Sequence, residues 1–217
     1  MKIIFMILSL FFCVNTVNTK ELIYHGDENS NKIYLTFDDG YSLNNALSIL
    51  DTLKKYDVPA AFFVEGDFLK NNPIAVKRIA DEQILANHTM CHCDIRKMSN
   101  DALTKDIKEF ERIAYDITGK QITKFFRPPM GFINKEKEKL IYNLGYDIFM
   151  WNVKIYDYVY NDDMGVNYVI DNIVKQTKKG SIILMHTLTN SNAYALPVII
   201  ETLRGKGFEF SPLTDLI

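Results

Sequence analysis

The stretch KIYLTFDDG, from Lys32 to Gly40, passes from a short apolar run into two adjacent aspartates and a glycine. Short apolar runs that end in turn-forming residues are typical of buried strands. The adjacent carboxylates of Asp38 and Asp39 repel each other unless a positive group lies beside them. An Asp-Gly pair is also a common turn, so this stretch alone leaves a turn and a functional site both open.

Strand-like and helix-like segments alternate along the rest of the chain. The further strands that we expect cover residues 60–64, 146–151 and 181–185, with weaker candidates at 84–86 and 208–210. The expected helices, recognised by apolar residues three and four apart, cover residues 43–53, 73–82, 103–117, 135–144, 166–177 and 196–206. This alternation predicts an α/β fold in which helices cover a parallel sheet, either closed as a barrel or open.

Composition limits the classes of partner. The chain has 217 residues, of which 47% are hydrophobic and 24% charged, as in an ordinary globular domain. Its formal net charge of -2 offers no basic surface to nucleic acid or to an anionic membrane. We therefore expect one domain, residues 20–217, that is monomeric and binds no nucleic acid.

Residues 1–19 have the character of an export signal. Lys2 precedes an apolar run from Ile3 to Val14, which fits the hydrophobic part of a signal peptide. The run is short for a membrane span, which needs about 20 apolar residues. We expect an extracellular, cell-wall or outward-facing location, and cleavage of this segment or its retention as a membrane anchor both stay open.

A histidine pair follows the short apolar run at 84–86. In Asn87-His88-Thr89-Met90-Cys91-His92, the two histidines are four residues apart and would share one face of a helical turn, within reach of one ion. Coincidence on a polar helix is the alternative. If the turn is helical, Cys91 points away from the face that the two histidines share and is expected to be a small buried residue. The spacing of Cys91 and Cys93 closes too small a loop for an easy disulfide.

Three later polar clusters also follow apolar runs. In Arg127-Pro128-Pro129-Met130-Gly131, the prolines fix the direction of an arginine that could lower the pKa of a strand-end carboxylate. The others are the segment from Trp151 to Asp157 and Tyr158, and the segment 184–187 around His186. Each alone has a structural explanation. Taken with the aspartate pair and the histidine pair, these clusters put three of the four histidines and two adjacent carboxylates at strand ends. Functional residues of α/β proteins gather at such strand ends.

These five segments, in this order, resemble the five motifs of the polysaccharide deacetylases, the NodB-homology group or carbohydrate esterase family 4. They are TFDDG at 36–40, HTMCH at 88–92, RPPMG at 127–131, the segment from Trp151 to Asp157, and LMH at 184–186. The resemblance covers residues 32–216. It implies a distorted barrel of the (β/α)7 type and hydrolysis of N-acetyl amide bonds.

The resemblance also implies a role for each matched residue. Asp39, His88 and His92 would bind a divalent metal, usually zinc and sometimes cobalt or another ion. Asp38 would be the general base and His186 the general acid, with Arg127 holding Asp38 and Asp157 tuning His186. The residues expected to contact the sugar are Pro128, Pro129, Gly131, Trp151 and Tyr158.

A narrower resemblance is to the delta-lactam-biosynthetic muramic-acid de-N-acetylases of spore cortex formation. It rests on LKKYDVPAAFFVEGDF at 53–68, ITGKQI at 117–122 and LMHTLTNSNAYALPVII at 184–200. It implies peptidoglycan as the partner and N-acetylmuramic acid as the sugar, which would become muramic delta-lactam.

Three alternatives stay open. The chain could deacetylate N-acetylglucosamine in peptidoglycan or chitin-like polymers, or it could hydrolyse esters with the same site. It could also be a degenerate glycan-binding domain without activity, because the segment before His88 lacks a Gly-His pair usual in the family. Cys93 and Tyr158 also depart from the Pro and Trp that are common at their positions.

Overall fold

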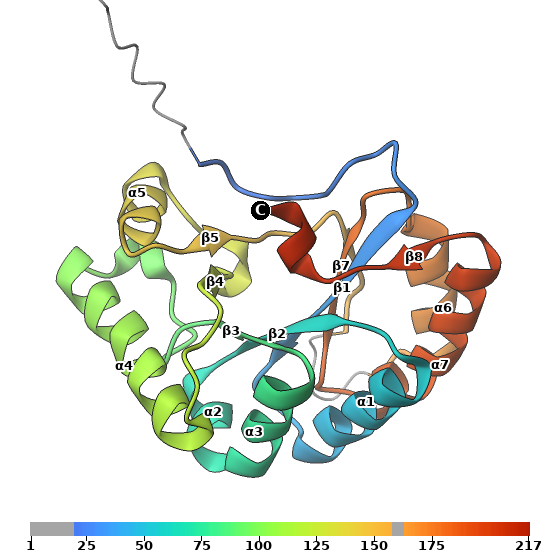
Figure 1. Cartoon of the computed structure of the whole chain (residues 1–217), viewed down its shortest axis with the longest axis horizontal. Coiled ribbons are helices and arrows are strands. Elements are labelled where there is room, and N and C mark those ends of the chain that lie inside the picture. Colours follow the sequence, from blue (N-terminus) through green and yellow to red (C-terminus); the bar gives the residue numbers. More distant parts are fainter. Residues whose placement is uncertain (1–19, 158–162) are drawn as a thin grey trace, which may run out of the picture.

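The computed structural model describes residues 20–157 and 163–217, so the expected export segment and Tyr158 lie outside it. A parallel sheet forms a half-barrel, and helices form an arc around it (Figure 1). The strands are β1 (Lys32–Asp39), β2 (Ala60–Val64), β3 (Ile84–Asn87), β4 (Phe125–Phe126), β5 (Asp147–Ile148), β6 (Val153–Lys154), β7 (Ile182–His186) and β8 (Glu209–Phe210). The helices are α1 (Leu43–Tyr56), α2 (Gly66–Asn71), α3 (Pro73–Glu82), α4 (Asn100–Thr118), α5 (Lys135–Asn143), α6 (Val166–Gln176) and α7 (Asn190–Gly205).

The strand order explains the distorted shape of the barrel. The strands run β5-β4-β3-β2-β1-β7-β6, and β8 pairs separately with β1. The chain before β1 lies across the gap between the sheet's two ends, since Ile23 bridges to Phe149 and His25 to Ser181. The predicted (β/α)7-type barrel is therefore confirmed as a half-barrel whose opening the N-terminal segment spans.

Two apolar layers stabilise the sheet. Side chains alternate between its faces, so Phe62 of β2 packs under the helices while Phe63 packs inside the half-barrel. Helix α4 contributes a buried stripe and ends at Gly119, whose φ of 70° gives the left-handed conformation common at helix ends. Burial of the strands on both faces accounts for their nearly continuous apolar sequences.

Some elements differ from the sequence-based expectations. The run at 146–151 forms only β5, and the separate strand β6 follows it. Helix α7 begins at Asn190, well before the expected start at Leu196, because its first turns carry polar side chains that show no apolar period. Asn192 is therefore helical and buried. Helix α2 and strand β4 were not predicted at all.

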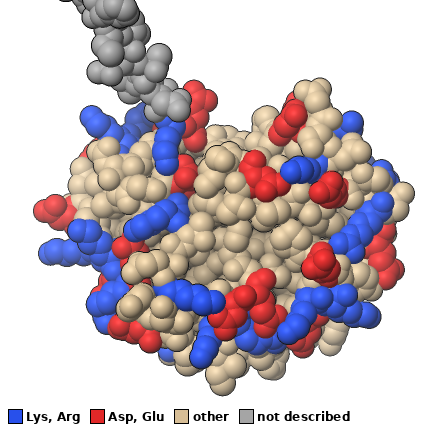
Figure 2. Space-filling model, viewed as in Figure 1, with Lys and Arg blue, Asp and Glu red and all other residues tan. Residues whose placement is uncertain are grey.

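The surface carries charge of both signs. On the face drawn in Figure 2, acidic and basic side chains are interspersed around the edge, and the middle is mostly uncharged. Within the two described ranges, no helix is long and apolar enough to cross a membrane.

Candidate active site

The register of the sheet brings the predicted functional residues to one edge. Asp38 of β1 lies opposite His186 of β7, and Asn87, which precedes His88, lies opposite Phe126, which precedes Arg127. These strand ends surround a cavity of about 520 Å³. The residues that line it are Asp38, Tyr41, His88, His92, Met130, Phe132, Trp151, Lys154, Ile155, Leu184 and His186.

Asp38 is held by a buried arginine. The Nη1 atom of Arg127, a residue with no solvent exposure, donates to Asp38 Oδ1 at 2.8 Å and to Thr36 Oγ1 at 3.0 Å. Its Nε and Nη2 atoms donate to the carbonyl oxygens of Phe149 and Met150. Burial alone would raise the pKa of Asp38, but the charges of Arg127 and the nearby histidines outweigh it and lower that pKa. Asp38 is therefore a carboxylate at neutral pH.

His186 is held in the same way by an acid. Its Nδ1 lies 2.7 Å from Asp157 Oδ1, and its backbone N–H donates to Asp157 Oδ2 at 2.9 Å. Asn192 fixes the pair, because its amide donates to Asp157 Oδ2 and to the carbonyl oxygen of His186. Burial alone would lower the pKa of His186, but the hydrogen bond and charge of Asp157 raise it. His186 can thus hold a proton that it can later donate.

The third group consists of donors suited to a cation. Asp39 Oδ1 accepts a hydrogen bond from Thr187, whereas Asp39 Oδ2 is buried without any hydrogen-bond partner among the described residues. Burial raises the pKa of Asp39 to about 7 in the absence of a metal. His88 Nδ1 lies 2.8 Å from the carbonyl oxygen of Arg127 and donates to it, which leaves Nε2 as an acceptor. Burial lowers the pKa of His88 to about 4, so this ring is neutral.

The segment that carries His88 and His92 is a loop, and the expected helical turn is wrong. Thr89 and His92 both have left-handed backbone conformations, with φ of 69° and 47°. The rings of His88 and His92 still meet, with centroids 5.1 Å apart, because the loop folds back on itself. Asn87 Oδ1 and Thr89 Oγ1 accept from backbone N–H groups of the loop and hold it in this shape.

The cysteine expectations are also corrected. Cys91 is exposed rather than buried, and it forms a disulfide with Cys93. The turned loop brings their Cα atoms to 5.1 Å, which lies within the range that a disulfide can bridge.

The donor chemistry fits a divalent cation, although the side chains do not close around one. In the described part of the chain, no group of three or more His, Cys, Asp or Glu residues is arranged to hold a metal ion. However, Asp38, Asp39, Glu65, His88 and His92 line one narrow crevice. A buried carboxylate oxygen without a partner is costly, and a cation beside Asp39 would satisfy it. The unpartnered oxygen of Asp39 is therefore the feature of this crevice that fits a bound cation.

Two residues close to Asp39 and Gly40 were not identified from the sequence. Thr187 orients Asp39, and Glu65, whose pKa burial raises to about 7, lies against Gly40. A Cβ atom at Gly40 would lie 2.2 Å from the Glu65 carboxyl carbon. Because these contacts join separate strands, only the position of Thr187 beside His186 could have drawn attention to it.

Some of the predicted sugar-contacting residues line the cavity, and others are buried and do not line it. Trp151 lines the cavity, whereas Pro128 and Pro129 are buried beneath it. Gly131 has a φ of 71°, and a Cβ atom there would lie 2.9 Å from the Trp151 ring, so a side chain would displace the tryptophan. Met130 and Phe132, which the sequence did not single out, line the cavity beside Trp151.

A second cavity, of about 610 Å³, shares Tyr41 with the first. Its lining is rich in amides and hydroxyls, including Ser42, Asn44, Asn45 and Thr189. Such groups suit the hydroxyls of a neighbouring sugar.

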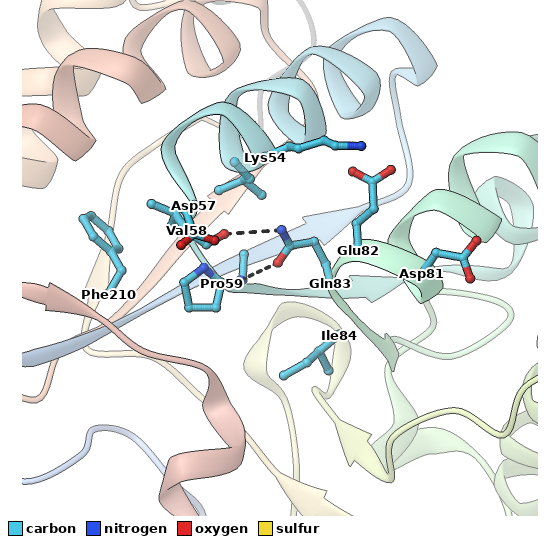
Figure 3. Close-up of a pocket in the computed structure, with 11 residues that line it drawn as sticks. Lys54, Asp57, Val58, Pro59, Asp81, Glu82, Gln83, Ile84 and Phe210 are labelled. Atoms are coloured by element: carbon cyan, nitrogen blue, oxygen red, sulfur yellow. Dashed lines mark hydrogen bonds between the residues drawn. The ribbon is translucent and has the colours of Figure 1, made fainter.

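A larger cavity, of about 670 Å³, lies at the amino ends of β2 and β3, away from these residues (Figure 3). Several of its polar side chains are already engaged. Gln83 accepts from the N–H of Ala60 and donates to the carbonyl of Val58, while Glu82 pairs with Arg78. This cavity therefore offers no comparable site.

A parallel half-barrel with a charged acid and base facing each other at its carboxyl edge defines a hydrolase of the carbohydrate esterase type. Residues 25–149 match the family model described as polysaccharide deacetylase, and the chain belongs to that family. Members of this family hydrolyse N-acetyl amide bonds and are generally metal-dependent.

The relatives refine this placement. Peptidoglycan-N-acetylmuramic acid deacetylase PdaA of Bacillus subtilis is 36% identical over 198 residues, which span 91% of this chain and 75% of PdaA. The solved structure of Bacillus subtilis PdaA, a family 4 carbohydrate esterase, has a TM-score of 0.87 and covers 90% of this chain and 84% of its own.

Two other relatives represent the alternatives. A peptidoglycan-N-acetylglucosamine deacetylase of Bacillus cereus is 32% identical over 198 residues, 89% of this chain and 70% of the relative. A CE4 family pseudoenzyme from Bacillus anthracis is 28% identical with a TM-score of 0.84, and the match covers 91% of this chain and 69% of that one.

Proposed function

We propose that this chain is an exported, metal-dependent deacetylase that acts on N-acetylmuramic acid in peptidoglycan. The observation that carries the proposal is the pair of opposed groups in one cavity: Asp38 bound to Arg127, and His186 bound to Asp157. The similarity to PdaA supports the choice of sugar. Retention of Asp38, Asp39, His88, His92 and His186 argues against a degenerate binding domain.

Asp38 acts as the general base. Its pKa is lowered, so it is ionised and can accept the proton of the water that attacks the acetyl carbonyl. Arg127 is a positioning residue, because its guanidinium is saturated by protein acceptors and fixes the direction of the carboxylate.

His186 acts as the general acid. An amide nitrogen leaves readily only when it is protonated, and His186 holds a proton because Asp157 raises its pKa. Hydrolysis adds one water across the C–N bond, so acetate and a free amine are the products. Asp157 and Asn192 position His186 through their hydrogen bonds to it.

Asp39, His88 and His92 would hold the divalent cation, and we propose zinc because a carboxylate and two imidazoles suit it. When bound, such an ion lowers the pKa of its water towards ~7 and polarises a carbonyl oxygen. The unpartnered oxygen of Asp39 and the Nε2 atom of His88, which lies 3.5 Å from Asp38 Oδ2, are the donor atoms that the structure offers.

The cellular setting follows from the substrate. Peptidoglycan lies outside the cytoplasmic membrane, which agrees with the export signal expected in residues 1–19. A free amine on muramic acid can close onto the lactyl carboxyl group, with loss of water, to give the delta-lactam of spore cortex, and we therefore propose a role in sporulation.

The test is acetate release from glycan strands stripped of their stem peptides, with and without a chelator, followed by mass analysis of the muropeptides. Metal-dependent acetate together with deacetylated or lactam-containing muramic acid is the expected result. Acetate released from glucosamine residues alone would favour deacetylation of N-acetylglucosamine as the function. No acetate after zinc or cobalt is restored would overturn the proposal.

A further inference from the structure

We propose that Lys154 binds the free lactyl carboxylate of the N-acetylmuramic acid residue under attack, and so selects muramic acid over glucosamine. The inference rests on the proposed function and adds the residue that determines its specificity. Lys154 lies within the fourth motif, but it is not among the residues to which the family resemblance gives a catalytic or metal-binding role.

The strand geometry directs Lys154 into the catalytic cavity. Lys154 is the last residue of β6 and lies opposite Leu184 of β7, two residues before His186. Val153 is buried in the core beneath the helices, and successive side chains of a strand point to opposite faces. Lys154 lines the cavity that also contains Asp38 and His186, and its Nζ lies 5.9 Å from the centroid of the Trp151 ring.

Lys154 also carries a positive charge that no acidic side chain of the described residues neutralises. It is the one lysine or arginine among the residues that line this cavity, and it makes no ion pair within the described ranges. The charge of Arg127 is matched by Asp38, and that of protonated His186 by Asp157. An anion that enters from solvent therefore finds its unmatched protein partner in Lys154.

The chemistry of the sugar supplies that anion. N-acetylmuramic acid differs from N-acetylglucosamine by a lactyl ether on the ring carbon next to the one that bears the N-acetyl group. A cavity that receives the acetamide beside Asp38 must therefore receive the lactyl group within the same space. Without a stem peptide, this group ends in a carboxylate that is ionised at neutral pH. With a stem peptide attached, it is a neutral amide.

The experiment compares kcat/KM on two substrates for wild type, Lys154→Gln and Lys154→Arg. One substrate is a disaccharide with a single peptide-free muramic acid, and the other is a neutral N-acetylglucosamine oligomer. Lys206→Gln is the matched control, because Lys206 is exposed just after α7 and outside the cavity. A single muramic residue ensures that the carboxylate belongs to the sugar under attack.

We expect Lys154→Gln to lower the ratio of the two kcat/KM values on the order of tenfold, mainly through KM, as for loss of a hydrogen bond to a charged group. Lys154→Arg should restore most of the ratio, and the difference should shrink as salt rises. When the lactyl carboxylate is converted to an amide, the wild type should no longer have a higher ratio of kcat/KM values than Lys154→Gln. An unchanged ratio in Lys154→Gln, with active wild type, would overturn this inference alone. Wild type that releases no acetate from either substrate would overturn the proposed function and the inference together.

Discussion

Asp38 and His186 occupy opposite positions in the register of β1 and β7, yet each is paired with a different residue of opposite charge. Arg127 lowers the pKa of Asp38, while Asp157 raises the pKa of His186. Two groups whose environments push their pKa values in opposite directions are what acid–base catalysis needs at neutral pH.

Asp38→Asn should reduce turnover by at least about a thousandfold, within the range for loss of a general base, while metal stays bound. Asparagine keeps the size of the side chain but cannot accept the proton. His88→Ala should lose both turnover and metal, because the Nε2 donor is removed. Acetate release and zinc content of the purified variants check both outcomes. Normal activity in either variant would contradict the assigned roles.

Asp157→Asn should move the alkaline limb of the kcat/KM profile to lower pH. The direction follows from His186, whose pKa is raised by Asp157. Activity that needs protonated His186 is present below that pKa and is lost as pH rises through it, so a lower pKa brings the loss to lower pH. The acid limb, which depends on Asp38, serves as the internal control. An alkaline limb that does not move would rule out Asp157 as the residue that tunes His186.

The sequence was sufficient to predict which strand ends carry polar residues, because apolar runs mark the strands and the polar residues follow them directly. Asp38, His88, Arg127 and His186 do meet around one cavity. The hydrogen bond of Thr187 to Asp39 could not be assigned, since it depends on the register between β1 and β7. The hydrogen bonds of Asn192 to Asp157 and His186 depend on the early start of α7.

The loop of the histidine pair shows where periodicity fails. Spacing of four residues suggested a helical turn, but Thr89 and His92 adopt left-handed conformations with no glycine or asparagine to signal them. Hydrogen bonds from the neighbouring segments and the close approach of Gly66 determine this shape, and those come from the tertiary structure.

Arg127→Lys should destabilise the fold by about 2–4 kcal/mol, because lysine cannot supply donors to Asp38, Thr36 and two carbonyl oxygens at once. Urea unfolding at neutral pH measures the difference. The contribution of Asp38 to stability should be present above its unfolded-state pKa and disappear as pH falls through its lowered native pKa. The difference in the free energy of unfolding between wild type and the variant should therefore become smaller at acidic pH. A constant gap down to the acid transition would show that the pair contributes through packing instead of charge.

Gly66→Ala should weaken metal binding more than it weakens the fold. A Cβ atom at Gly66 would lie 2.4 Å from the carbonyl oxygen of Met90, so the loop between His88 and His92 would have to shift. The hydrogen bond from the Gly66 N–H to Thr89 would be strained by the same shift. We expect zinc affinity to fall at least about tenfold, which corresponds to about 1.4 kcal/mol. Gly205→Ala is the control, because nothing lies within 4 Å of its added Cβ atom at the end of α7. Equal zinc affinity in the two variants, measured by calorimetry, would show that the loop position does not control the metal site.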